Sequence, residues 1–140
     1  MTEIRHLGPG DEARVHAAAE LFDAPPTAAA TTRFLTSAGH HLLVAYDGEE
    51  PVGMVTGVET THPDKGTEMF LYELGVHEVA RGRGIGRALV EQLLGIARQT
   101  GCYGMWVAVD ADNDAALATY RSTGAATDEG SQHVLTWQLP

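Results

Sequence analysis

The chain has 140 residues, with 19 acidic side chains against 9 basic ones and a formal net charge of -10. This length fits one domain over residues 1–140, large enough to bury roughly 65–70% of its unfolded surface. The negative charge opposes nucleic-acid phosphates and anionic membranes, whose binding needs clustered Lys and Arg, so neither partner is expected. A single cysteine allows no internal disulfide, and no signal pattern or long apolar run is present, so we expect a soluble cytoplasmic protein.

The first part of the chain predicts a strand, two helices and a hairpin. Residues 2–7 form the predicted strand, and a helix opens at Asp11 and Glu12 with apolar residues at helical spacing as far as Phe22. A second helix is predicted from Thr27 to about Ser37. Two strands then follow, over residues 40–46 and 51–61, joined by the turn sequence Asp-Gly-Glu-Glu.

Residues 68–76 predict a third consecutive strand. A period of two places Phe70, Tyr72, Leu74 and Val76 on one face and Met69, Leu71, Glu73 and Gly75 on the other.

The second half predicts two helices and two strands. An amphipathic helix begins at Ile85 and stops before Gly101, and residues 103–109 are apolar enough for a central buried strand. Asp112 or Asn113 caps a last helix, and residues 134–139 form a closing strand that pairs within the domain or across a dimer. The order β-α-α-β-β-β-α-β-α-β predicts a mixed α/β domain.

The loop from Arg81 to Arg87 concentrates positive charge in an acidic chain. Three of the nine basic residues, Arg81, Arg83 and Arg87, alternate there with Gly82, Gly84 and Gly86. The loop leads into the start of a helix, where free N–H groups and a partial positive charge suit an anion. Glycines let the backbone approach such a ligand, and arginines add charge-assisted bonds to phosphate. The spacing matches neither G-x-G-x-x-G nor G-x-x-x-x-G-K-[ST].

A strand, then Arg81-x-x-Gly84-x-Gly86, then an amphipathic helix resembles the acetyl-CoA pyrophosphate loop of the GNAT N-acetyltransferases. The Asn113-led helix with Tyr120 near its end, followed by Gly124, is similar to the second signature of that superfamily. The resemblance covers essentially the whole chain. It implies a mostly antiparallel central sheet flanked by about four helices, acetyl-CoA as cosubstrate, and direct acetyl transfer to an amine in a ternary complex.

Two segments resemble a narrower group, the small aminoglycoside 3-N-acetyltransferases. These are residues 70–76, Phe-Leu-Tyr-Glu-Leu-Gly-Val, and residues 7–11, Leu-Gly-Pro-Gly-Asp. That group carries an acidic residue at the position of Glu73. The favoured acceptor is therefore an aminoglycoside, acetylated at its 3-amino group.

The resemblance also implies roles for individual residues. The backbone of Leu74, Gly75 and Val76 would pair with the pantetheine arm, with the Val76 N–H as oxyanion donor. Tyr120 is the candidate acid for the leaving thiolate, and Glu73 is the candidate base or ammonium ligand. The predicted cofactor-binding residues besides those three are Arg81, Gly82, Arg83, Gly84, Ile85, Gly86, Arg87 and Asn113.

The acceptor is expected to be a cationic small-molecule amine. Asp110, Asp112 and Asp114 cluster after the predicted central strand, one of them as a helix cap, and Asp110 and Asp112 are candidate substrate ligands. His77 is expected to be a solvated loop residue and Cys102 a core thiol, and the histidines show no metal-ligand spacing, so no metal is expected.

Other functions remain open. A GNAT enzyme acting on a polyamine, another small amine or a protein amino group is the main rival, and a non-catalytic acyl-CoA-binding module is the second. A homodimer is compatible with the sequence, which shows no clear interface pattern.

Overall fold

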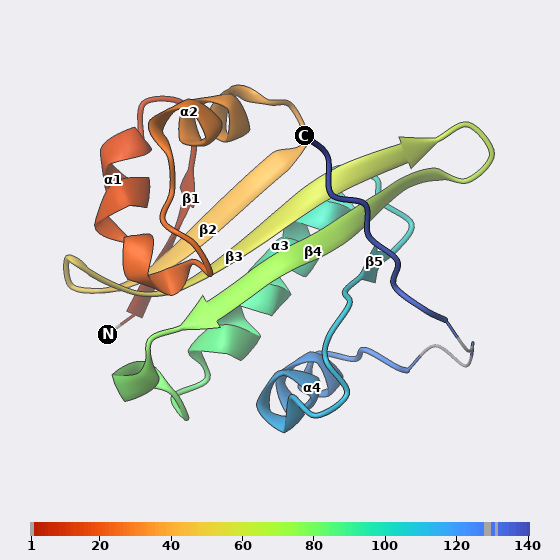
Figure 1. Cartoon of the computed structure of the whole chain (residues 1–140). Coiled ribbons are helices and arrows are strands. Elements are labelled where there is room, and N and C mark those ends of the chain that lie inside the picture. The colour runs from red at the N-terminus through yellow and green to blue at the C-terminus, as the bar shows by residue number, and fades with distance from the viewer. Residues whose placement is uncertain (1, 128–129, 131) are drawn as a thin grey trace.

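The computed structural model describes residues 2–127, 130 and 132–140 and contains one five-stranded sheet in the order β1-β2-β3-β4-β5. The first four strands pair antiparallel, and β5 joins β4 in parallel (Figure 1). The strands are β1 (Thr2–Leu7), β2 (His40–Asp47), β3 (Glu50–His62), β4 (Gly66–Val76) and β5 (Met105–Trp106). The predicted mixed, mostly antiparallel sheet is confirmed, and four α-helices flank it in the described part of the chain.

Helices cover both faces of the sheet. Figure 1 shows α1 and α2 in front of the first strands, α3 behind the sheet, and α4 below β4, where it contacts α3. The helices are α1 (Glu12–Ala17), η1 (Ala19–Leu21), α2 (Ala28–Thr36), η2 (Glu78–Ala80), α3 (Ile85–Gln99) and α4 (Asp114–Ser122). No helix in the described part of the chain is long and apolar enough to span a membrane.

The sheet separates two apolar cores. Leu89 and Leu93 of α3 are fully buried against Val55 and Leu71 of the sheet. On the opposite face, Val44, Tyr46 and Met54 pack beneath α1 and α2. Residues 42–46 of β2 are all buried because both faces of this strand are covered, so the strand appears in the sequence as a continuous apolar run.

A β-bulge in β4 corrects the predicted division of that strand into faces. The register passes from Gly57↔Leu71 to Thr56↔Glu73, so Tyr72 is an extra residue without a partner on β3. An extra residue reverses the alternation beyond it. Leu74 and Val76 therefore share the α3 face with Met69 and Leu71, while Glu73 lies on the opposite face.

Three other predicted elements differ from the structure. The first helix ends at Ala17 and continues only as the short η1, because the chain turns before Pro25 and Pro26. The predicted central strand 103–109 is a two-residue strand at the sheet edge. Its remaining apolar residues, Val107 and Val109, pack against the α3 core and do not pair with β4. Residues 134–139 form no strand, and their large side chains are exposed.

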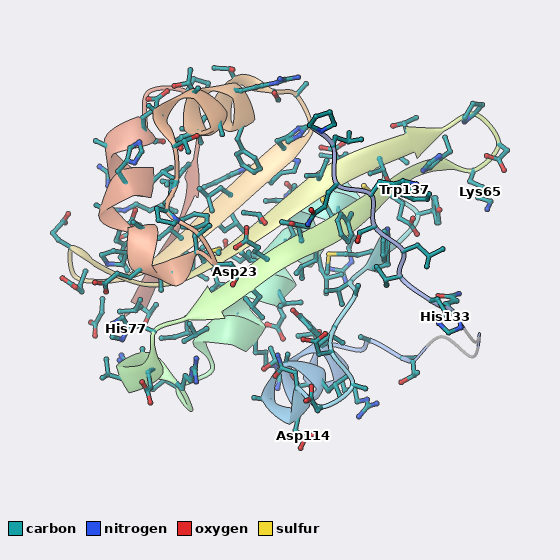
Figure 2. The ribbon with its side chains drawn as sticks, in the orientation of Figure 1. Asp23, Lys65, His77, Asp114, His133 and Trp137 are labelled. Atoms are coloured by element: carbon teal, nitrogen blue, oxygen red, sulfur yellow. The ribbon has the colours of Figure 1, made fainter. Side chains whose placement is uncertain are left out.

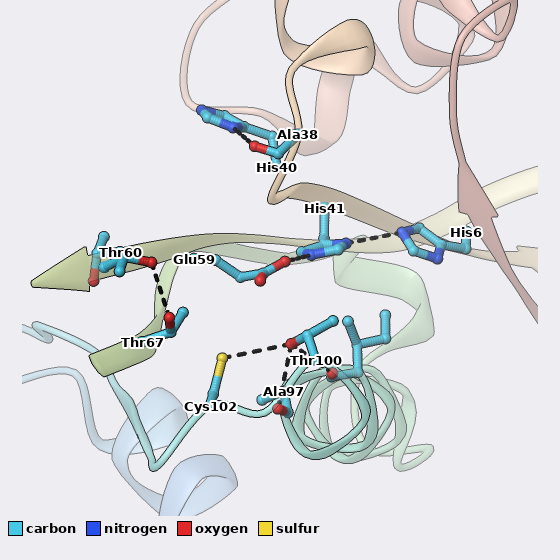
Figure 3. A network of polar contacts seen from close by, with 12 residues as sticks. His6, Ala38, His40, His41, Glu59, Thr60, Thr67, Ala97, Thr100 and Cys102 are labelled. Atoms are coloured by element: carbon cyan, nitrogen blue, oxygen red, sulfur yellow. Dashed lines mark hydrogen bonds and ion pairs between the residues drawn. The ribbon is translucent and has the colours of Figure 1, made fainter. Parts of the chain in front are cut away.

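A polar network joins the first three strands (Figure 3). His41 bridges His6, at 3.2 Å between ring nitrogens, and the Glu59 carboxylate, at 2.6 Å. Burial, followed by repulsion from His41, lowers the pKa of His6 below its ordinary value. This corner of the sheet therefore favours a neutral His6.

Candidate active site

The site begins where β4 and β5 diverge. The two strands pair only at Met69↔Met105 and Phe70↔Trp106. Beyond this point a cavity of about 650 Å³ opens between residues 74–76 and 108–110. Its volume lies in the range of small-molecule sites, roughly 300–1,000 Å³.

The end of β4 presents backbone groups to this gap. The His77 N–H donates to the Val52 carbonyl of β3 at 2.8 Å. Since amides alternate along a strand, the Val76 N–H points to the opposite edge, toward β5. The Arg81 Nε–H donates to the Val76 carbonyl at 3.3 Å on that same edge. The bulge at Tyr72 determines which N–H groups of β4 face β3. The first N–H after the bulge, that of Glu73, donates to Thr56 Oγ1 of β3 at 3.1 Å.

Glu73 joins the strand to the segment between η1 and α2. Its Oε2 accepts a hydrogen bond from the Asp23 N–H at 3.3 Å, although the two residues lie 50 positions apart in the chain. The Glu73 side chain is half-buried, and both residues line the cavity. Figure 2 shows Asp23 over the middle of the sheet and His77 where β4 ends.

Close packing at Gly75 fixes the position of η1 against β4. A Cβ at Gly75 would collide with the Leu21 carbonyl oxygen, a backbone atom that has no rotamer to adopt. Only glycine lets the η1 turn lie this close to the strand. The cavity wall formed by residues 20–23 is therefore held by a backbone contact.

The loop before α3 forms a second cavity, of about 360 Å³, which shares Leu74, Val76 and Arg81 with the first. Gly82 and Gly84 adopt left-handed φ angles of +77° and +78°, and Gly84 precedes the first turn of α3. The first amides of a helix lack intrahelical acceptors. The loop therefore offers free N–H groups and left-handed glycines beside the second cavity, the features that suit an anion.

The three arginines of the loop differ in their surroundings. Arg81 lines both cavities, and Arg87 lines the second while its Nε donates to Glu91 at 2.9 Å. Arg83 lies outside the lining of both cavities and pairs with Asp47, the last residue of β2, at 3.4 Å. Its side chain therefore anchors the loop to the hairpin.

Helix α4 places a tyrosine in the wall of the first cavity. Asn113 caps the helix, with its Oδ1 accepting from the Ala116 N–H at 3.1 Å, so of the two predicted caps, Asp112 and Asn113, the structure has Asn113. Asn113 also lines both cavities. Tyr120, near the end of the same helix, is buried, and this burial raises the pKa of its phenol above the ordinary value. The phenol therefore keeps its proton throughout the neutral range.

Carboxylates surround the first cavity. Asp110 is among the lining residues as predicted, whereas Asp112 and Asp114 lie outside it. In Figure 2 the Asp114 side chain points away from the sheet. The acidic lining residues are Glu20, Asp23, Glu73, Glu78 and Asp110.

Several of these lining residues had no signal in the sequence. Glu20, Asp23 and Glu78 come from surface turns that only the tertiary fold brings together. His77 is also part of the lining, and 40% of its side chain is exposed, in keeping with the predicted solvated loop position. Its Nδ1 accepts from the Val79 N–H at 3.4 Å, and its Nε2 lies 4.0 Å from the Glu20 carboxylate.

Comparisons with known proteins identify the family. The model of the acetyltransferase (GNAT) family matches residues 11–125. The chain is 40% identical over 108 residues to the N-alpha-acetyltransferase RimI of Mycobacterium tuberculosis, which covers 76% of this chain and 66% of that protein. This chain thus spans slightly less than two thirds of that relative.

Two solved structures are similar over nearly their full length. The aminoglycoside acetyltransferase meta-AAC0020, from an uncultured soil metagenomic sample, superposes with a TM-score of 0.88 at 21% identity, covering 98% of this chain and 96% of that one. The aminoglycoside acetyltransferase HMB0005, also from an uncultured soil metagenomic sample, gives a TM-score of 0.79 at 25% identity, covering 100% and 98%. The first of these establishes likeness of fold alone. With the family model matched over most of the chain, the protein belongs to the GNAT family of N-acetyltransferases, whose acetyl donor is acetyl-CoA.

Proposed function

We propose that this chain transfers an acetyl group from acetyl-CoA to a primary amine of a small polycationic acceptor, with an aminoglycoside as the favoured substrate and its 3-amino group as the favoured position. The observation that carries the proposal is the acidic lining of the larger cavity. Five carboxylates line it, against the single guanidinium of Arg81. Clustered like charge in a concave site attracts and holds the opposite charge, so the lining favours an acceptor with several ammonium groups.

The smaller cavity would hold the pyrophosphate of the donor. Its left-handed glycines and the first amides of α3 offer N–H groups to an anion, and Arg81 and Arg87 supply charge. The edge of β4 from Leu74 to Val76 offers backbone groups to an extended pantetheine arm, in the manner of an added strand. When bound, acetyl-CoA supplies a thioester as the acetyl source.

Three groups of the chain would then act on the reacting atoms. The Val76 N–H, directed into the gap between β4 and β5, would stabilise negative charge on the acetyl oxygen. Glu73 would hold the acceptor ammonium and accept its proton through water. The protonated phenol of Tyr120 would donate to the leaving thiolate, a role for which its raised pKa keeps it in the acid form.

A second candidate is acetylation of a protein N-terminal amine. The 40% identity to a protein named as an N-alpha-acetyltransferase supports it. An N-terminal residue presents one ammonium and an extended backbone, so this acceptor would use fewer of the cavity's carboxylates. The acidic lining is the reason to place the polycationic acceptor first.

Initial rates of CoA release with kanamycin, gentamicin, spermine and a panel of peptides with free N-termini separate the candidates. The proposal predicts the highest kcat/KM with an aminoglycoside, and NMR of the product is expected to show acetylation of the 3-amino group. Turnover of peptides with no aminoglycoside product would establish the second candidate. Spermine as the best acceptor would keep the polycationic class and reject the antibiotic.

A further inference from the structure

A single hydroxyl group interrupts the apolar middle of β3. Residues 52–58 are Val-Gly-Met-Val-Thr-Gly-Val, and Thr56 carries the one polar side chain of this run. Thr56 is only 6% exposed. Because burying a hydroxyl costs stability unless it forms a hydrogen bond, its partner indicates why a threonine stands here.

The partner of this hydroxyl lies at the β-bulge of β4. Thr56 Oγ1 accepts a hydrogen bond from the Glu73 N–H at 3.1 Å, and Glu73 directly follows the extra residue Tyr72. A bulge disrupts the regular ladder of backbone hydrogen bonds at this point. The Thr56 hydroxyl therefore binds the first amide beyond the disruption and ties it to β3.

The bulge switches the edge toward which the amides of β4 point. Before it, the Met69 N–H donates to the Gly104 carbonyl on the β5 side at 3.0 Å. Beyond it, the His77 N–H donates to the Val52 carbonyl of β3 at 2.8 Å, although residues 69 and 77 are an even number of positions apart. Without the bulge, the amides beyond residue 72 would each face the other edge, and the Val76 N–H would face β3.

Glu73 is held at both ends by different parts of the fold. Its N–H is bonded to Thr56 of β3, and its Oε2 accepts from the Asp23 N–H at 3.3 Å, in the segment between η1 and α2. The first bond fixes the backbone from which the side chain starts. The second fixes the carboxylate, which lines the first cavity.

We propose that Thr56 is a positioning residue for acetyl transfer: its hydroxyl fixes the bulge, and through the bulge it places the Glu73 carboxylate and directs the Val76 N–H toward β5. The proposal rests on the roles proposed above for Glu73 and Val76. Thr56 lies outside the lining of both cavities, so it acts through Glu73 and the strand rather than on either substrate.

Two substitutions in the full chain separate the hydroxyl from the space that Thr56 fills. Thr56→Val keeps the branched shape and removes the hydroxyl, whereas Thr56→Ser keeps the hydroxyl and removes the methyl group. With the acceptor that gives the fastest turnover, Thr56→Val is expected to lower kcat about 10-fold or more, because the reacting groups are misplaced. Its Kd for acetyl-CoA is expected to stay within about 3-fold of wild type, and Thr56→Ser is expected to restore most of kcat. The reverse order, with Val active and Ser impaired, would show a packing role and overturn the proposal.

Thr60→Val is the matched control on the same strand. Thr60 Oγ1 donates to the Glu68 carbonyl of β4 at 3.2 Å, so the substitution removes a hydroxyl bond between the same two strands. Thr60 lies outside the lining of both cavities, and its loss is expected to leave kcat unchanged. A fall in kcat equal to that of Thr56→Val would overturn the proposal, because loosening β3 from β4 anywhere would then suffice.

Amide hydrogen exchange measured by NMR reports on the bond itself, without turnover. The Glu73 N–H is expected to exchange about 10-fold faster in Thr56→Val than in the wild type and at a nearly unchanged rate in Thr56→Ser. Equal exchange in the wild type and Thr56→Val would overturn the proposal. Glu73→Gln alone tests the role proposed for Glu73, and the exchange rate tests Thr56 independently of that role, so the two failures are distinguishable.

A double-mutant cycle tests whether Thr56 acts through Glu73. Residues that act through one another have effects that do not add. Thr56→Val is therefore expected to lower kcat less in the Glu73→Gln background than in the wild type. Fully additive effects of the two substitutions would contradict the proposal.

Discussion

Gly75→Ala tests whether the contact between η1 and β4 shapes the acceptor cavity. The new Cβ would meet the Leu21 carbonyl oxygen, and because this is a backbone atom the whole turn must shift. Overpacking of this kind costs about 1–3 kcal/mol. For a domain of this size each kcal/mol lowers Tm by roughly 2–5 °C, so a loss of about 2–15 °C is expected. The displaced turn carries Asp23, which donates to Glu73, and misplacement of about 1 Å can reduce kcat/KM up to ~100-fold.

The assay combines thermal unfolding with acceptor kinetics at saturating acetyl-CoA. Gly95→Ala is the control, since a Cβ there meets nothing within 4 Å and Gly95 lies inside α3. Replacing a helical glycine by alanine adds about 0.5–1 kcal/mol, so this variant gains stability and keeps its activity. If Gly75→Ala retained wild-type Tm and acceptor kcat/KM, the contact would not position the cavity wall.

Three further substitutions test the site and the polar network. Tyr120→Phe is expected to lower kcat about 100-fold or more with little change in acetyl-CoA affinity, because it removes only the proton donor. An unchanged kcat in stopped-flow or steady-state assays would reject the acid role. Glu73→Gln is expected to lower acceptor kcat/KM by roughly 10- to 100-fold, since it removes a charged partner of the ammonium, and equal rates with wild type would reject that partnership. His6 has a lowered pKa in the folded state, so the unfolded state binds more protons as the pH falls. The stability that a neutral His6 contributes is therefore full above about pH 6.5 and is lost as the pH falls through the folded pKa. Urea unfolding from pH 7.5 to 5 should show that the free energy of unfolding falls less steeply with pH in His6→Gln than in the wild type. An equal fall in both would contradict this.

The part of the site that is local in sequence was predictable. The glycine-arginine loop, the amphipathic α3 and the Asn113 helix each occupy a short segment whose pattern dictates its conformation. Their combination also carried the resemblance to the family. The placement of Tyr120 in the cavity wall follows from the same helix.

Features that depend on distant segments were not predictable. The bulge at Tyr72 adds one residue to a period-two pattern, and nothing in the local sequence marks where it falls. The bond between Asp23 and Glu73 spans 50 positions, so the acidic lining emerges only when η1 packs on β4. Arg83 is a further example. Its place in the glycine-arginine loop suggested that it binds phosphate, and only the fold shows that Asp47 lies beside it.

The net charge first excluded anionic partners and then supported a cationic acceptor once the cavity lining was known. Part of the negative charge of the chain, carried by Asp110, Glu73 and Asp23, lies in the lining of the first cavity. The Arg81 side chain lies at the border between the two cavities, next to the proposed donor site. The proposed function thus assigns the cationic loop to the anionic donor and the acidic cavity to a cationic acceptor.

A competition experiment tests the acceptor assignment most directly. Kanamycin and a peptide with a free N-terminal alanine are mixed at equal concentration with limiting acetyl-CoA, and mass spectrometry quantifies both acetylated products. Their ratio equals the ratio of kcat/KM for the two acceptors. The acidic cavity predicts that acetyl-kanamycin predominates, and that Glu73→Gln shifts the ratio toward the peptide. Acetylation mainly of the peptide by the wild-type chain would contradict the assignment.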